Sequence, residues 1–297
     1  MKILTYMTRT DEIPQLGILH KEKDAVIPFS LLDIDYKTMM ETILHLTRAE
    51  FERLHLAQVD GDIPTIPLKM LKLCAPIRKP AQDIICLGIN YADHETEVSR
   101  YEIENLAKRE PYPIYFSKRV NETTACYDTI PAYTNLVDSL DYEAELAIII
   151  GKDAKNVSEA DAEKYIFGYT ILNDMSARNL QTRHQQWYFG KSLDGFTPLG
   201  PYITTSDELP LPLNLSIRSY VNDELRQNSN VNQMIYPIPR IISELSQGMT
   251  LKAGTIISTG TPAGTGMGCN PPAFLKPGDV VRCEIEGIGA LINTIGE

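Results

Sequence analysis

Three acidic side chains stand where two apolar runs of the sequence begin and end. Glu143 and Glu145 open the apolar run 144–151, and Asp174 follows a second run, Tyr165–Leu172. Because side chains alternate between the two faces of a strand, residues two apart point the same way. If the two runs pair as strands, the three carboxylates converge into an oxygen site of the kind that Mg²⁺ or Mn²⁺ prefers. The alternative is an exposed strand end at which the carboxylates are simply solvated.

A histidine and a glutamate three residues apart are candidates for an acid–base pair. His94 and Glu97 follow a predicted strand and would share one face of a short helix. A carboxylate beside an imidazole raises its basicity, which suits a general base that activates water. Taken alone, this spacing favours a solvated surface pair, and that alternative stays open. Lys191, in Gly-Lys-Ser, would offset the negative charge that three carboxylates leave around a divalent ion.

A glycine-rich run, Ser258–Gly268, is a further candidate for binding chemistry. Its glycines would let backbone amides approach an anion closely, and Thr261 adds a hydroxyl. The run lacks both nucleotide-binding glycine patterns, so the alternative is a tight turn between strands. The sequence also lacks His-Glu-x-x-His and G-x-S-x-G, which leaves metal-plus-base chemistry as the enzyme class that the residues support.

The elements that would position these residues are mostly short strands. Arg240–Gln247 and Ser158–Tyr165 are predicted as short helices, Tyr36–Leu56 has helical spacing, and Asn222-Asp223 is typical of a hairpin turn. Runs of β-branched and aromatic residues predict the strands. They are Met1–Tyr6, Leu16–His20, Ala25–Pro28, Ile84–Gly88, Ile114–Ser117, Phe167–Leu172, Leu215–Val221, Thr255–Thr259 and Val280–Ile285.

The chain length and the change of character along it predict two domains. A chain of 297 residues exceeds the usual size of about 150 residues per domain. Residues 1–75 form a small α+β unit, and a proline-punctuated connector leads into residues 76–297. The many short strands of the second part indicate a β-rich α+β fold, with a mixed sheet that is rolled or barrel-like.

Composition excludes several classes of function. The chain carries 28 basic and 39 acidic residues, a formal net charge of -11, which argues against a nucleic-acid binder. No window of about 18 apolar residues occurs, so we expect no membrane span. The five cysteines are scattered without a CxxC pair, which favours reduced thiols and a cytoplasmic location.

Seven segments in order resemble the fumarylacetoacetate hydrolase family over about residues 80–297. The small N-terminal unit is also similar to the leader domain of many bacterial members. The matching segments are LGINYADHETE, YFSK, DYEAELAIIIGK, FGYTILNDMSARNLQ, QWYFGKSLDGFTPLGP, STGTPAGTG and GDVVRCEIEGIGALIN.

The resemblance implies a role for each matching residue. It implies Mg²⁺ as the cofactor, with Mn²⁺ or Ca²⁺ as alternatives, a homodimer, and small β-diketo or α-keto acids as substrates. The implied metal ligands are Glu143, Glu145 and Asp174. His94 and Glu97 match the water-activating pair, on a segment that orders over the substrate. Lys191 and Gln181 match residues that stabilise an oxyanion, and the residues that match substrate-binding positions are Thr261, Gly260 and Tyr91.

The sequence departs from the family pattern near the expected mouth of the site. Arg119 and Val120 follow Lys118 where a proline or small residue is usual, and the stretch Val98–Pro113 is long and charged. We therefore predict that Arg119 helps to bind a second substrate carboxylate.

The function predicted from these residues is metal-dependent hydrolysis of a C–C bond in an acylpyruvate or fumarylpyruvate. In this mechanism His94, oriented by Glu97, takes a proton from the attacking water. The alternative within enzymes is decarboxylation of oxaloacetate or isomerisation of a hydroxymuconate-type diacid, which need no attacking water. A catalytically silent relative that binds a keto acid is the alternative outside enzymes.

Overall fold

Two neighbouring strands join the distant parts of the sequence that carry the acidic residues. The computed structural model describes residues 1–99 and 112–297. Within it, β10 (Ala144–Ile150) pairs antiparallel with β11 (Ile166–Asn173), and the register places Ala144 opposite Asn173. The expected pairing of the two apolar runs is therefore confirmed.

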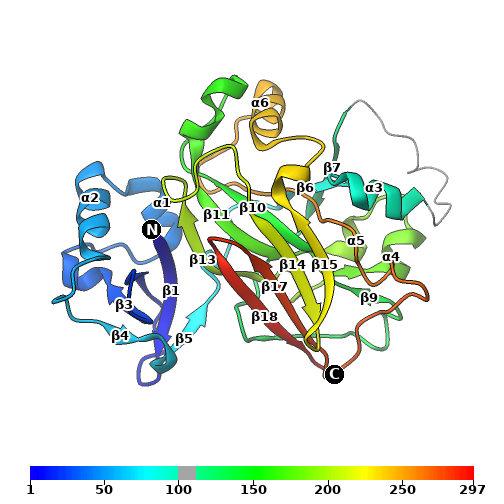
Figure 1. The fold of residues 1–297 in the computed structure, drawn as a ribbon, viewed down its shortest axis with the longest axis horizontal. Coiled ribbons are helices and arrows are strands. Elements are labelled where there is room, and N and C mark those ends of the chain that lie inside the picture. The colour runs from blue at the N-terminus through cyan, green and yellow to red at the C-terminus, as the bar shows by residue number, and fades with distance from the viewer. Residues whose placement is uncertain (100–111) are drawn as a thin grey trace.

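These two strands lie in the middle of an 11-stranded mixed sheet (Figure 1). Its other strands are β1 (Lys2–Thr8), β2 (Gln15–Leu19), β3 (Ala25–Pro28), β4 (Ile66–Pro67), β5 (Leu71–Cys74), β6 (Ile84–Gly88), β7 (Ile114–Lys118), β13 (Leu199–Thr205) and β16 (Ile256–Ser258). The order is β4-β3-β2-β1-β13-β11-β10-β16-β6-β7, with β5 beside β1, and β16 runs parallel to β6. Because β4 and β7 are free ends of this order, the sheet is not a closed barrel.

A second, five-stranded sheet covers one face of the first. It contains β8 (Thr129–Ile130), β14 (Ser216–Val221), β15 (Glu224–Asn230), β17 (Val280–Ile285) and β18 (Gly289–Ile295), and a separate pair joins β9 (Leu140–Asp141) to β12 (Ser176–Ala177). Asn222 and Asp223 connect β14 to β15 with φ angles of 49° and 65°, as the left-handed turn of a tight hairpin requires. The predicted turn is confirmed.

The helices are short and lie at the edges of the sheets. They are α1 (Met39–His45), α2 (Arg48–Ala57), α3 (Ala92–Ser99), α4 (Arg178–Arg183), α5 (Tyr188–Lys191) and α6 (Ile238–Gly248), with 3-10 turns at Phe29–Leu32, Leu68–Met70, Glu159–Tyr165 and Val231–Gln233. Within residues 1–99 and 112–297, no helix has the length and apolar character to cross a membrane.

The helical spacing over Tyr36–Leu56 corresponds to two helices rather than one. The first helix ends at His45, and Thr47 caps the second, since its side chain accepts from the Glu50 amide while Glu50 accepts from the Thr47 amide. This capping box starts a new helix where periodicity alone predicts continuity. The segment Ser158–Tyr165 is likewise a 3-10 turn rather than an α-helix.

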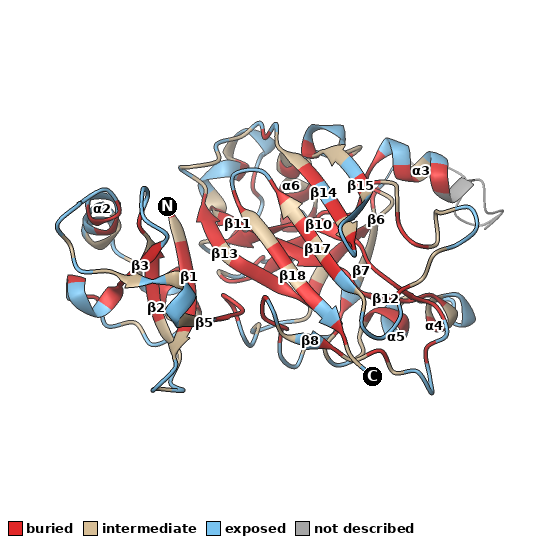
Figure 2. Ribbon diagram, turned by 60° about the horizontal axis from the view of Figure 1, so that its bottom comes forward, coloured by how far each residue is buried: buried red, intermediate tan, exposed pale blue. Residues whose placement is uncertain are grey.

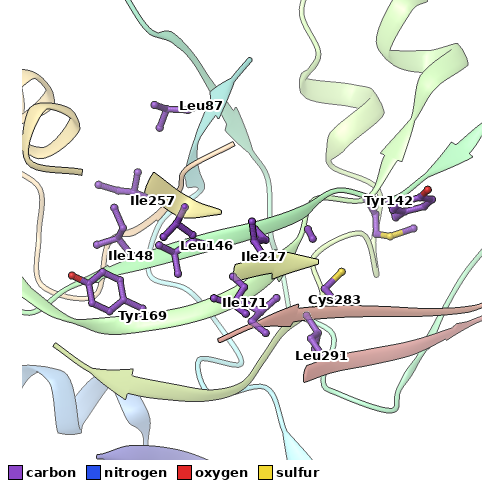
Figure 3. Close-up of a cluster of buried hydrophobic side chains, with 14 of the residues drawn as sticks. Leu87, Tyr142, Leu146, Ile148, Tyr169, Ile171, Ile217, Ile257, Cys283 and Leu291 are labelled. Carbon is purple, nitrogen blue, oxygen red and sulfur yellow. The ribbon is translucent and has the colours of Figure 1, made fainter. Parts of the chain in front are cut away.

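The core explains why β10 is apolar along its whole length. Leu146 and Ile148 point into a cluster shared with the second sheet, where Ile171, Ile217 and Leu291 also lie (Figure 3). Ala147 and Ile149 point to the opposite face, into a cluster that extends to the N-terminal strands. A strand that is buried on both faces has no polar alternation. Figure 2 shows the resulting band of buried residues along the central strands.

The N-terminal unit is joined to the large sheet by strand pairing. β1 pairs with β13 through Lys2–Thr204 and Ile3–Ile203, so its strands extend the sheet at the end shown in blue in Figure 1. The β-rich α+β fold with a mixed sheet is confirmed. The division into residues 1–75 and 76–297 stays a prediction.

Candidate functional site

Three buried carboxylates meet at one end of the β10–β11 pair. Glu143 precedes β10, Glu145 lies in it, and Asp174 follows β11, so the antiparallel pairing brings them together. One carboxylate oxygen of each lies within 4.8 Å of the others. Their exposed fractions are 6%, 1% and 0%. An exposed strand end is therefore excluded, and the predicted convergence is confirmed as geometry.

Two buried lysines lie among these carboxylates. Lys191 Nζ is 2.7 Å from Glu143 Oε2 and 2.7 Å from Asp174 Oδ2. Lys118, at the end of β7, donates to Asp174 Oδ1 at 2.7 Å and to the Met175 carbonyl at 3.1 Å. Both side chains are fully or almost fully buried, so neither is a solvated surface charge. Lysine ammonium groups this deep require ionised partners.

Arg178 links Glu143 to a fourth buried carboxylate. Its Nη2 is 2.7 Å from Glu143 Oε1 and 2.8 Å from Asp141 Oδ2, while its Nη1 donates to Gln181 Oε1 at 3.0 Å. Four carboxylates thus meet three cations, which leaves one negative charge unbalanced.

Glu145 is the one of the four carboxylates that makes no ion pair among the described residues. Burial acts to raise the pKa of Glu143, but Lys191 and Arg178 outweigh it and lower that pKa to about 2. Burial, together with the charges of Asp174 and Glu143, instead raises the pKa of Glu145 well above its usual range. Glu145 makes its hydrogen bonds with Ser258 Oγ, at 2.5 Å, and the Gly260 amide, at 3.0 Å.

The donor set fits a hard divalent cation. Glu143, Glu145 and Asp174 offer carboxylate oxygens, which are the ligands that Mg²⁺, Mn²⁺ and Ca²⁺ prefer in proteins. A bound cation would also give Glu145 a direct cationic partner, which it does not have among the ion pairs of the described residues.

His94 and Glu97 form a buried pair on α3. His94 Nδ1 lies 2.8 Å from Glu97 Oε2, and the side chains are about nine-tenths buried. Glu97 also accepts the Gly264 amide at 2.9 Å and the Thr265 hydroxyl at 3.5 Å. A solvated surface pair is therefore excluded. With Glu97 bound at Nδ1, the Nε2 atom is left to exchange a proton.

A cavity of about 380 Å³ is lined by the acid–base pair and by two of the three carboxylates, Glu143 and Glu145, whereas Asp174 is not part of its wall. Its polar and charged wall includes most of the predicted site residues. These are His94, Glu97, Glu143, Glu145, Gln181, Lys191 and Thr261. Further wall residues come from β6, β7, the α4–α5 segment and the glycine-rich loop. They include Leu87, Phe116, Arg178, Arg183, His184, Trp187 and Met267.

Two predicted substrate-binding residues are held by neighbouring polar groups. The Thr261 hydroxyl donates to the Ala144 carbonyl at 3.0 Å and accepts from Gln227 Nε2 at 2.7 Å. Gly260 does not line the cavity; its amide holds Glu145 instead. Its contribution in this structure is to place a carboxylate.

Tyr91 and Arg119 lie away from the cavity wall. Tyr91 is fully buried, and its phenol oxygen has no hydrogen-bond partner among the described residues. The Arg119 guanidinium is more than half exposed and lies 3.7 Å from Asp83 Oδ1. Arg119 does not line the cavity, and its contact with a second substrate carboxylate stays a prediction. Of the stretch Val98–Pro113, residues 100–111 lie outside the described residues.

Comparison with known proteins places the chain in a family. The family model described as the C-terminal part of fumarylacetoacetate hydrolase matches residues 83–296, more than half of the chain. The chain belongs to the fumarylacetoacetate hydrolase family. Members of this family are enzymes that act on small keto acids.

Three members give a measure of the similarity. Oxaloacetate tautomerase YisK of Bacillus subtilis is 44% identical over 229 residues, 77% of this chain and 74% of that protein. A fumarylacetoacetate hydrolase from Exiguobacterium antarcticum is 34% identical, with a TM-score of 0.85 over 100% of this chain and 99% of the other. Maleylpyruvate hydrolase from Sphingobium sp. SYK-6, solved with manganese(II) and pyruvate, is 28% identical, with a TM-score of 0.78 over both entire chains.

Sequence reasoning missed several members of this hydrolase-family site. No role is predicted for Lys118 from the sequence, although a lysine that ends an apolar strand is a signal of a buried partner. Arg178 follows Asp174 closely in Asp-Met-Ser-Ala-Arg, and Asp141 stands two residues before Glu143. Their roles depend on contacts between β9, β12 and α4 that spacing does not predict.

Proposed function

We propose that this chain is a divalent-metal-dependent enzyme that interconverts the enol and keto forms of a small α-keto diacid, with oxaloacetate as the first candidate. The observation that carries the proposal is the buried His94–Glu97 pair, which lines the same cavity as Glu143 and Glu145 of the carboxylate cluster. The 44% identity to an oxaloacetate tautomerase supports this reaction over the hydrolysis predicted from sequence.

The reaction needs a group that can give and take a proton. In ketonisation the enol oxygen loses one proton and carbon 3 gains one, so the composition of the substrate does not change. His94 is the candidate for this transfer, because the contact of its Nδ1 with Glu97 fixes the orientation of the ring. Loss of His94 would then impair tautomerisation as well as hydrolysis, so the choice of substrate distinguishes the two reactions better than this variant does.

The carboxylate cluster would hold the metal. Glu143, Glu145 and Asp174 are the proposed ligands. A divalent ion bound there supplies a Lewis acid that stabilises negative charge on the oxygens of a keto acid. Lys191 and Arg178, whose cationic groups touch Glu143, hold that ligand in its ionised form.

A second substrate carboxylate needs a cation that the cluster has not already used. Arg183, at the end of α4, lines the cavity beside His184. No contact with an acidic group is observed for Arg183 among the described residues, whereas Arg178 and Lys191 each contact two carboxylates. We therefore assign the distal carboxylate to Arg183 rather than to Arg119.

Hydrolysis of an acylpyruvate is the second candidate. The observation that favours it is Gln181, whose Oε1 accepts from Arg178 and whose amide nitrogen is thereby left as a donor at the cavity wall. Such a donor to an oxyanion contributes about 3 kcal/mol in other enzymes. The fold similarity to a maleylpyruvate hydrolase supports the same reaction.

A substrate panel tests the proposal. The ultraviolet enol absorbance of oxaloacetate, acetylpyruvate and fumarylpyruvate is followed with Mg²⁺ and with EDTA, and the products are quantified. Mg²⁺-dependent loss of enol-oxaloacetate with no loss of total oxaloacetate supports the tautomerase. Cleavage of an acylpyruvate to two acids supports the hydrolase instead, and loss of oxaloacetate with release of CO₂ supports a decarboxylase.

A further inference from the structure

The glycine-rich loop that follows β16 binds the protein's own carboxylates. Its backbone amides reach three different acidic side chains, since Gly260 donates to Glu145 and Gly264 donates to Glu97. Gly266 donates to Asp141. The sequence predicts that these amides approach an anion, and the anions that they approach lie within the chain. The loop thus connects a proposed metal ligand, the partner of the proposed base and a fourth acid.

The glycines are required by close packing on these carboxylates. A Cβ at Gly266 would lie 2.7 Å from Asp141 Oδ1 and 2.5 Å from the Ala273 carbonyl oxygen. A Cβ at Gly268 would overlap the carboxylate of Glu97. Because the loop contacts Asp141 at one point and Glu97 at another, a shift at one contact moves the donors at the other.

Asp141 is the fully buried anchor of this loop. Its Oδ1 accepts the amides of Gly266 at 2.7 Å and Tyr142 at 2.9 Å, and its Oδ2 accepts the amide of Met267 at 3.0 Å. Oδ2 also accepts Arg178 Nε at 2.9 Å. Asp141 does not line the cavity. It therefore acts on the site only through the groups that it holds.

We propose that Asp141 is a positioning residue that holds the loop against α3, so that the Gly264 amide stays on Glu97 and Glu97 stays on His94. The same carboxylate orients Arg178 toward Glu143. Its catalytic consequence rests on the proposed function, whereas its structural consequence, the docking of α3 on the loop, does not.

The first test needs no substrate. In Asp141→Asn one oxygen becomes an amide nitrogen, which cannot accept from the loop amides. We expect backbone amide hydrogen exchange to accelerate at least tenfold in residues 264–267 and in α3, with the second sheet unchanged. Asp138→Asn is the matched control, since Asp138 is an exposed carboxylate on the same segment that accepts from Ser139. Unchanged exchange in α3 would overturn the proposal.

The second test is a double-mutant cycle in the Mg²⁺-loaded enzyme. If Asp141 acts through Glu97, Asp141→Asn lowers kcat at least tenfold, and Asp141→Asn/Glu97→Gln is within about threefold of Glu97→Gln alone. If the decrease of kcat in the double variant equals the product of the decreases in the two single variants, the proposal is overturned. If Asp141→Asn does not fold, Gly266→Ala tests the same contact from the loop. Absence of turnover in the unsubstituted enzyme would contradict the proposed function, and the exchange experiment would still decide the role of Asp141.

Discussion

His94 Nδ1 lies 2.8 Å from Glu97 Oε2, and this pair is placed on the same cavity wall as Glu143 and Glu145. The relationship joins residues almost 50 positions apart in the chain. A single histidine at the carboxylate cluster would have no fixed tautomer, whereas Glu97 holds the proton on one nitrogen. The arrangement places a proton carrier beside the proposed cation site.

Glu97→Gln tests whether the pair moves the proton. Glutamine keeps the size of the side chain but removes the negative charge beside the His94 ring. We expect kcat for enol-oxaloacetate to fall about 100-fold, the lower part of the range for general acid–base catalysis, with KM changed much less. Steady-state kinetics check this, with Glu95→Gln on the same helix as the control. Equal rates for the two variants would contradict a role for Glu97.

Mg²⁺ should raise the melting temperature through the three carboxylates. An ion at 100 times its Kd stabilises the native state by about 2.7 kcal/mol, which corresponds to a shift of about 4 °C for a chain of 297 residues. Asp174→Asn removes one proposed ligand and should abolish most of the shift. Asp194→Asn alters an exposed carboxylate and should keep it. A shift that survives in the Asp174 variant would place the ion elsewhere.

The variants Arg183→Ala and Arg119→Ala together test which arginine binds the second carboxylate of the substrate. Arg183→Ala should raise KM for oxaloacetate at least tenfold and leave acetylpyruvate, which has one carboxylate, nearly unchanged. Arg119→Ala should change neither value, because its guanidinium pairs with Asp83 outside the cavity. The reverse pattern would restore Arg119 as the residue that binds the second carboxylate.

Lys118→Met tests the buried ion pair that sequence reasoning missed. Removing one partner of a buried ion pair lowers the free energy of unfolding by about 3–5 kcal/mol. Because Lys191 remains beside Asp174, we expect a decrease near the lower end of this range. Mg²⁺ should recover part of it, since the ion replaces the missing charge. Denaturant unfolding with and without Mg²⁺ measures both effects, with exposed Lys69→Met as the control. A variant as stable as the control would show that Lys118 is dispensable.

The acidic cluster was predictable because residue spacing along one strand and the pairing of two apolar strands determine it. Spacing by two places Glu143 and Glu145 on one face, and antiparallel pairing of two apolar strands brings Asp174 to the same end. The hairpin at Asn222-Asp223 was predictable for a similar reason, since both residues tolerate positive φ.

The buried cations were not predictable in the same way. Lys118 reaches Asp174 across 56 residues, and Lys191 reaches Glu143 across 48. These contacts depend on tertiary packing rather than on periodicity. Arg119 illustrates the converse, because its proximity to Lys118 in sequence suggested a place in the site, whereas its guanidinium lies 3.7 Å from Asp83 Oδ1 and does not line the cavity. The family resemblance supplied roles for matching residues but not the contacts of Asp141.

The central claim is that His94 transfers a proton in a cation-dependent site. The most direct measurement is the rate of enol-oxaloacetate ketonisation by the unsubstituted enzyme and by His94→Asn, each with Mg²⁺ and with EDTA. We predict a fast rate only for the unsubstituted enzyme with Mg²⁺, and at least 100-fold slower rates in the other three conditions. A His94→Asn enzyme that is as fast as the unsubstituted one with Mg²⁺ would contradict the claim.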